Sequence, residues 1–124
     1  QHKVTGVVIG NLTKVRDPLL IHDTIPNHIK GFISGKPTQK LSDELIKYTY
    51  KNFGDKLIVI GVGGIFSAED AYKKIKLGAS LVQVVTGMVF EGPTLVSEIN
   101  YWISQFLKAD GFKTISDAIG TEAA

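Results

Sequence analysis

The sequence contains no cysteine, and no run of apolar residues in it reaches the roughly 18 needed to cross a bilayer. Without thiols the chain cannot form disulfides, thiolate metal sites or a cysteine nucleophile. An excess of charge of one sign is also lacking, because 14 basic residues face 12 acidic ones for a net charge of +2. Lys73, Lys74 and Lys76 have the spacing of a solvated helix face. This balance argues against a nucleic-acid partner, and we expect none.

The residues that are present have the composition of a folded domain. Hydrophobic residues make up 44% of the 124 residues and charged residues 21%, which is typical of globular rather than disordered chains. The first apolar run begins only a few residues from the start. We therefore expect the chain to be a piece of a longer protein.

Three continuous apolar runs, at residues 6–10, 57–61 and 80–85, predict parallel strands covered on both faces. Helical patterns lie between and after these runs, so that strands and helices alternate as in βαβ units. The segment 11–40 between the first run and the first helix contains Pro18, Pro26 and Pro37 and should be a long functional or poorly ordered loop.

Four helices are expected from spacing and capping signals. The first should place Leu41, Leu45 and Tyr48 along one stripe and end at Gly54. The second should be capped by Ser67, bury Ala71 and Ile75, and stop at Gly78. The third should open at Pro93 and end before Gly111, and a short turn should cover 116–119. The apolar stripe of the third comprises Leu95, Ile99, Trp102, Ile103 and Phe106.

Glycines follow the second and third apolar runs, where parallel strands would meet their loops. The second run continues into Gly63 and Gly64, and the third into Val85, Thr86 and Gly87. Bare backbone N–H groups at such ends can bind a phosphate, as often happens after the seventh and eighth strands of a (β/α)8 barrel. One Gly-Gly is more often a tight turn, but two such ends one βα unit apart favour a phosphate site. The spacing is not the dinucleotide fingerprint, so a mononucleotide such as FMN fits better.

Two weaker candidates accompany the glycines. Gly35 in the Ser-Gly-Lys-Pro segment would let the backbone approach a ligand, and Ser34 offers a hydroxyl, although such a segment alone is more often a turn. Asn11 ends the first run, and its amide could pair with an amide-bearing heterocycle. The commoner role for an asparagine there is a strand-end cap.

Together, these motifs resemble the quinone-linked class of dihydroorotate dehydrogenases. The shared motifs, in the same order over nearly the whole chain, lie at residues 34–37, 60–64, 78–83, 92–93 and 117–120. The resemblance implies an α/β fold in which residues 1–124 form the carboxy-terminal part, about three βα units, of a (β/α)8 TIM barrel that binds FMN. It also implies oxidation of dihydroorotate to orotate, with a quinone as electron acceptor, in pyrimidine biosynthesis.

The resemblance implies roles for individual residues as well. Asn11 would bind the pyrimidine beside Leu12, which stands where the family usually has threonine and cannot donate a hydroxyl hydrogen bond. A valine at position 85 replaces the tyrosine that the family favours. The residues expected around the flavin are Gly10, Ser34, Gly35, Gly63, Gly64, Val85 and Thr86.

The resemblance assigns the serine base, a flavin-contacting lysine and the quinone-tunnel helices to a missing amino-terminal half. We therefore expect no catalytic residue here, His2, His22 and His28 included, and no metal site. The chain alone should be inactive, with the missing half packed along its first strand. The complete protein should be membrane-associated, at the mitochondrial inner membrane in a eukaryote. Two alternatives stay open: another FMN-dependent barrel oxidoreductase, and a non-catalytic flavin- or phosphate-binding half-barrel.

Overall fold

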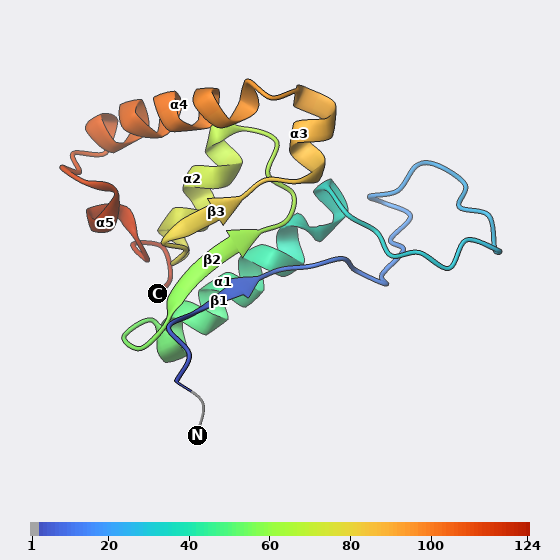
Figure 1. Cartoon of the computed structure of the whole chain (residues 1–124), viewed down its shortest axis with the longest axis horizontal. Coiled ribbons are helices and arrows are strands. Elements are labelled where there is room, and N and C mark those ends of the chain that lie inside the picture. The colour runs from blue at the N-terminus through green and yellow to red at the C-terminus, as the bar shows by residue number, and fades with distance from the viewer. Residues whose placement is uncertain (1–2) are drawn as a thin grey trace.

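The computed structural model describes residues 3–124, so His2 lies outside the described residues. Its centre is a parallel sheet of three strands, β1 (Gly6–Ile9), β2 (Ile58–Val62) and β3 (Leu81–Gln83), in the order β1-β2-β3 (Figure 1). Val8 pairs with Ile60 across the first junction. The predicted α/β arrangement is confirmed, with each strand slightly displaced from, or shorter than, its apolar run.

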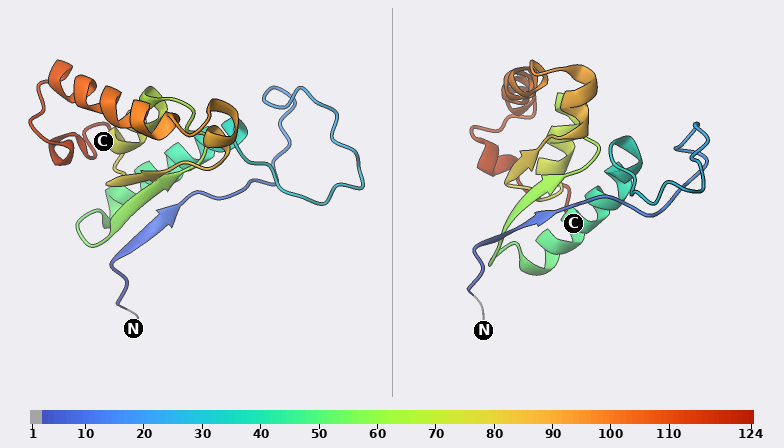
Figure 2. Two further views of the ribbon diagram at one scale, coloured as in Figure 1. Left: turned by 45° about the horizontal axis from the view of Figure 1, so that its top comes forward. Right: turned by 45° about the vertical axis from the view of Figure 1, so that its right-hand side comes forward.

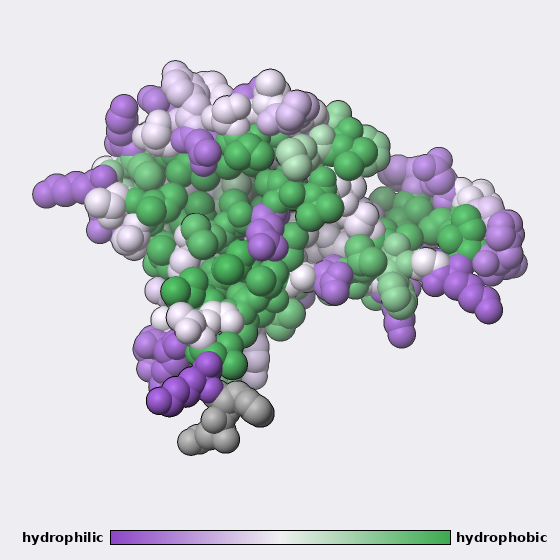
Figure 3. Space-filling model, viewed as in Figure 1, coloured by the Kyte–Doolittle hydropathy of each residue, from purple (hydrophilic) through white to green (hydrophobic). Residues whose placement is uncertain are grey.

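Helices follow each strand in the predicted order. They are the 3-10 helix η1 (Lys36–Thr38), α1 (Gln39–Phe53), α2 (Ala68–Lys76), α3 (Thr86–Glu91), α4 (Leu95–Ala109) and α5 (Ile115–Ala118). Helices α1 and α2 lie behind the sheet in Figure 1, and the opposite face carries no helix (Figure 2). That bare face is largely apolar (Figure 3), with Val8 51% and Leu81 61% exposed. The arrangement is that of a segment of a (β/α)8 barrel.

The core consists of two clusters on the helix-covered side of the sheet. The larger joins α2 to α4 through residues such as Tyr72, Ile75 and Ile99, and the smaller joins α1 to β2 through Ile46 and Val59. Helices α1 and α2 meet over β2 at Gly61, where a Cβ atom would lie 2.8 Å from the Ile46 Cδ1 atom. These contacts hold the three strands in one rigid layer and so place their carboxyl ends together.

The predicted start and stop of α2 are confirmed. The Ser67 hydroxyl accepts a hydrogen bond from Asp70 N at 3.2 Å. Gly78 adopts φ +119°, and a Cβ there would lie 2.2 Å from the Tyr50 ring. Gly120, from the motif near the chain's end, approaches the same ring, since its Cβ would lie 2.1 Å away. That motif therefore packs against Tyr50, at the sheet end opposite the glycine turns.

The helix predicted from the Leu41, Leu45 and Tyr48 stripe is confirmed and ends before Gly54. In the structure this stripe points outward, with exposed fractions of 47%, 48% and 62%. The face of α1 that is buried instead comprises Ser42, Asp43, Ile46 and Thr49. This inner face is partly polar because it meets a buried cation on α2.

That cation is Lys74, which is fully buried, so its assignment to a solvated face is wrong. Its Nζ atom donates to Asp43 Oδ1 at 2.6 Å and to Ser42 Oγ at 3.0 Å. Burial lowers the pKa of Lys74, and the hydrogen bond to Asp43 opposes that shift. The neighbouring Lys73 reaches Asp43 Oδ2 at 3.0 Å from a side chain that is 56% exposed. The carboxylate thus joins two lysines of which one is buried.

Four further details differ from the sequence prediction. The short helix α3 was not expected, and it forms where Gly87 passes so close to the Ile65 carbonyl that a Cβ would lie 2.0 Å from that oxygen. Helix α4 begins at Leu95, with Thr94 at its N-cap position, instead of at Pro93. Helix α5 starts one residue earlier than predicted. Trp102, expected in the buried stripe of α4, is 49% exposed.

The segment between β1 and η1 is the predicted long loop. It projects from the carboxyl end of the sheet (Figure 1) and holds no helix or named strand. An antiparallel bridge between Thr13 and Ile33 closes its base, with N–H to O distances of 2.9 and 2.8 Å. Within it, Arg16 Nη2 donates to the Ile29 carbonyl at 3.0 Å. The bridge brings Ser34 and Gly35 back to the end of the sheet.

Candidate functional site

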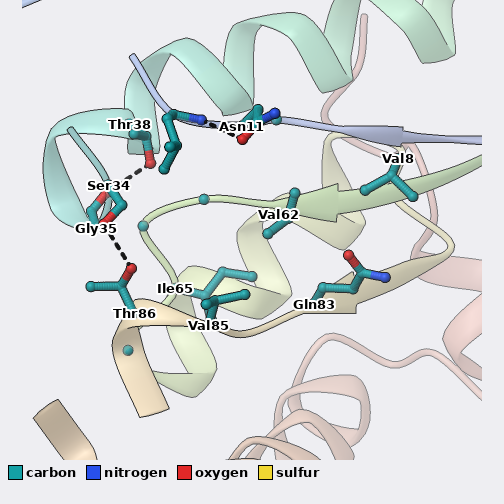
Figure 4. Close-up of a pocket in the computed structure, with 15 residues that line it drawn as sticks. Val8, Asn11, Ser34, Gly35, Thr38, Val62, Ile65, Gln83, Val85 and Thr86 are labelled. Atoms are coloured by element: carbon teal, nitrogen blue, oxygen red, sulfur yellow. Dashed lines mark hydrogen bonds between the residues drawn. The ribbon is translucent and has the colours of Figure 1, made fainter. Parts of the chain in front are cut away.

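A cavity of about 450 Å³ lies at the carboxyl ends of the three strands (Figure 4). Parallel strands of α/β folds place their ligand sites at this edge because the loops that follow each strand converge there. All of the residues proposed from the sequence for flavin or substrate line this one cavity, although they come from four separate segments of the chain. They are Gly10, Asn11, Leu12, Ser34, Gly35, Gly63, Gly64, Val85 and Thr86.

Hydrogen bonds tie the loop segment to the end of β3. Thr86 Oγ1 donates to Ser34 Oγ at 3.0 Å, which joins residues 52 positions apart in the sequence. Gly35 has φ +81°, and its carbonyl accepts from Thr38 Oγ1 at 2.8 Å. These bonds, drawn as dashed lines in Figure 4, keep two hydroxyl groups and a bend of bare backbone at the cavity wall.

Glycine at these positions is explained by close packing, and it also leaves the cavity wall free of side chains. Gly64 has φ +69°, and a Cβ there would lie 2.4 Å from the Gln39 Cβ atom. A Cβ on Gly10 would lie 2.0 Å from the Val62 carbonyl oxygen. The tight-turn interpretation therefore accounts for the backbone at these positions. The same turns leave backbone without side chains along the wall, so both interpretations hold together.

The donor set of the cavity suits a phosphate ester with a polyol chain. The lining offers backbone amides and the hydroxyls of Ser34, Thr38 and Thr86, and its residues include no lysine, arginine, aspartate or glutamate. Neutral donors at the end of a sheet are a recurrent phosphate cradle. The residues present therefore fit the FMN phosphate and ribityl chain that the sequence motifs imply.

Asn11 and Leu12 lie at the exposed rim of this cavity. Asn11 Oδ1 accepts a hydrogen bond from Leu12 N at 2.8 Å, which is the capping role expected as the alternative for this residue. Leu12 is 52% exposed and Val85 66%. These side chains leave one side of the cavity open.

Sequence reasoning missed several lining residues. Thr38 could have been found as the hydroxyl that follows the Ser-Gly-Lys-Pro segment. The others carry no chemical signal of their own and become recognisable only from strand direction. The missed residues are Val8, Thr38, Val62, Ile65 and Gln83, whereas Gly87 belonged to the glycine motif identified from the sequence.

Among residues 3–124, no group of three or more His, Asp or Glu side chains could hold a metal ion. In the same part of the chain, no helix has both the length and the apolar character needed to span a membrane.

The known proteins that this chain resembles belong to the family that the site suggests. The family described as Dihydroorotate dehydrogenase matches residues 1–107. Proteins named dihydroorotate dehydrogenase (quinone) from Xanthobacter autotrophicus and Nautilia profundicola are 44% and 43% identical to the chain over 96% and 94% of its length. The chain spans only 33% and 31% of those relatives.

A solved structure gives the same result for the fold. The ligand-free DHODH from Eimeria tenella superposes with a TM-score of 0.86 at 31% identity, and the match covers 95% of this chain and 32% of that one. The chain thus spans about a third of the length of the proteins that it matches. By the family match, the sequence identity and the shared fold, it belongs to the dihydroorotate dehydrogenase family.

Proposed function

We propose that the complete protein containing this chain is an FMN-dependent dihydroorotate dehydrogenase that passes electrons to a quinone. Residues 1–124 would be the carboxy-terminal part of its flavin-binding barrel. The observation that carries the proposal is the convergence of all the expected flavin and substrate residues on one cavity at the carboxyl edge of the sheet. The flavin would supply the hydride acceptor when bound, and this chain would supply the groups that hold it.

Each part of the cavity has a distinct task in this proposal. The backbone at Gly63 and Gly64 would bind the phosphate, because it offers neutral donors at a bare wall. The Thr86 hydroxyl would join it by turning its proton from Ser34 Oγ to the anion. Ser34, which accepts from Thr86, would contact the ribityl chain. Asn11 at the rim would orient the pyrimidine ring through its amide. Correct orientation of the reacting rings lowers the barrier to transfer by removing rotational freedom before the reaction.

The rest of the barrel must close the site. Strands β1 and β3 are both edges of the sheet, and unpaired edges favour pairing with further strands. Val8 and Leu12, both about half exposed, leave the cavity open on the side where the remaining portion of a barrel would lie. That portion would bring the catalytic base and the route to the quinone. Membrane association, at the mitochondrial inner membrane in a eukaryote, is part of the same proposal.

Leu12 supports a second candidate function. An apolar side chain at the rim favours a substrate other than dihydroorotate for an FMN-dependent barrel oxidoreductase, since no hydroxyl is offered at that position. The two candidates share the flavin and differ only in what reduces it.

Anaerobic reduction of the complete protein tests both. The purified protein should release FMN on denaturation, and dihydroorotate should bleach the bound flavin until a quinone analogue reoxidises it. Thr86→Val should lower flavin content, whereas Thr121→Val, whose hydroxyl bonds only its own turn at Ala118, should not. Bleaching by another reductant but not by dihydroorotate would select the second candidate. Bound flavin that dithionite bleaches but no organic substrate does would select a non-catalytic binding domain, and absence of flavin would reject both oxidoreductase candidates.

A further inference from the structure

Asp70 lies in the first turn of α2 and receives hydrogen bonds from two other segments of the site. Its Oδ2 atom accepts from Lys36 Nζ at 2.7 Å and from Phe66 N at 2.9 Å. Its Oδ1 atom accepts from Gln39 Nε2. Lys36 and Gln39 belong to η1 and the start of α1, and Phe66 follows the glycine turn. One carboxylate therefore joins the 34–39 segment, the 63–66 turn and helix α2.

The partnership with Asp70 gives Lys36 a different role from the one its position suggests. A lysine beside a candidate phosphate site is ordinarily taken as a ligand of the anion. Here its ammonium is bound to Asp70 and lies 5.1 Å from the centre of the Phe66 ring. Lys36 is absent from the lining of the cavity. The Lys36 ammonium therefore pairs with Asp70 outside the cavity, and the cavity lining itself offers only neutral donors.

The spacing between the two walls depends on the same contacts. Gly35 packs against the Phe66 ring, since a Cβ on Gly35 would lie 3.5 Å from the Phe66 Cζ atom, and Gly64 packs against Gln39. Both close approaches require the 34–39 segment to stay against the 63–66 turn. Asp70 is suited to hold it there as an anion. Burial favours its neutral form, but the hydrogen bonds from Lys36, Phe66 and Gln39 outweigh it and lower the pKa of Asp70.

We propose that Asp70 is the positioning residue of the phosphate cradle, with Lys36 as its partner and not as a ligand of the anion. The carboxylate sets the distance between the 34–39 segment and the glycine turn, so that backbone amides and hydroxyls converge on one phosphate. The identity of that phosphate as FMN rests on the proposed function above.

The direction in which Asp70→Asn changes anion affinity distinguishes a positioning role from a purely electrostatic one. Asp70→Asn removes a negative charge close to an anion site and frees Lys36, and Coulomb's law alone then predicts tighter anion binding. If Asp70 positions the cradle, the same substitution loosens the walls and weakens binding. Glu69→Gln is a matched control, because it removes the same charge from the same turn of α2 at an exposed side chain.

The experiment measures the FMN dissociation constant of the complete protein for wild type, Asp70→Asn, Lys36→Met, the double variant and Glu69→Gln. We expect Asp70→Asn to raise the constant about tenfold, the loss of roughly one charge-assisted hydrogen bond. Lys36→Met should raise it less, the double variant should match Asp70→Asn alone, and Glu69→Gln should stay within about twofold of wild type. The salt dependence of FMN binding should be the same in Lys36→Met and wild type.

An Asp70→Asn variant that binds FMN as tightly as wild type, or more tightly, would overturn the proposal. The proposal would also fail if Lys36→Met raised the FMN dissociation constant most and reduced its salt dependence. Hydrogen exchange of the amides in 34–39 and 63–66 gives a readout that needs no flavin. Exchange there should accelerate in Asp70→Asn and not in Glu69→Gln, while α4 stays protected. A wild-type protein that binds no FMN would reject the proposed function, and the exchange result would still decide whether Asp70 holds the two segments.

Discussion

The buried Lys74 provides a quantitative test of how the core is held together. Lys74→Met keeps most of the side-chain volume but removes the 2.6 Å ion pair with Asp43 and the 3.0 Å bond to Ser42. Breaking a buried pair from one side costs about 3–5 kcal/mol, because the other charge stays buried without its partner. Lys73 still reaches Asp43 at 3.0 Å, so we expect the lower end, a loss of about 3 kcal/mol in the free energy of unfolding.

Urea denaturation of the complete protein would measure this loss against two related variants. Lys73→Met removes a lysine from the same carboxylate, but its side chain is 56% exposed, so it should cost under about 1 kcal/mol. Adding Asp43→Asn to Lys74→Met removes the stranded charge and should recover roughly 1–2 kcal/mol. The reasoning is refuted if Lys74→Met costs no more than Lys73→Met, or if the double variant is less stable than Lys74→Met alone.

Three more predictions concern the site. Gly64→Val should abolish FMN retention, because its Cβ would lie 2.4 Å from Gln39 Cβ; unchanged flavin content on purification would contradict this. Asn11→Ala should lower turnover with dihydroorotate while flavin stays bound, and Leu12→Thr should tighten substrate binding by about 0.5–1.5 kcal/mol. Steady-state kinetics measure both effects. If Asn11→Ala leaves turnover unchanged, Asn11 is only a strand-end cap. The pKa of Asp70 is lowered from 3.8, so its contribution to stability should be complete above that pH and lost as the pH falls through the lowered value. Acid titration should therefore show the stability gap between wild type and Asp70→Asn closing below about pH 4, and a constant gap would disprove it.

Local sequence determined the elements that depend on neighbouring residues. The apolar runs predicted three parallel strands, and Ser67 predicted the start of α2, because a cap hydroxyl needs only the backbone three residues ahead. The glycine turns were recognisable for the same reason, since Gly63 and Gly64 both have positive φ. The candidate site followed, because parallel strands bring the ends of such runs to one edge.

Contacts between distant segments decided the rest. Leu41, Leu45 and Tyr48 point outward while the opposite face of α1 meets the buried Lys74, and no periodicity within α1 indicates that this face meets a cation from α2. The Asp70 contacts join residues 31 and 34 positions apart, so they were invisible in the sequence. Amphipathic spacing predicts that a helix forms and which side is apolar, whereas the side that is buried depends on which neighbours the folded chain supplies. In this chain the sequence determined the strands, turns and chemical groups, and the tertiary structure decided which charges are buried and which residues hold the site together.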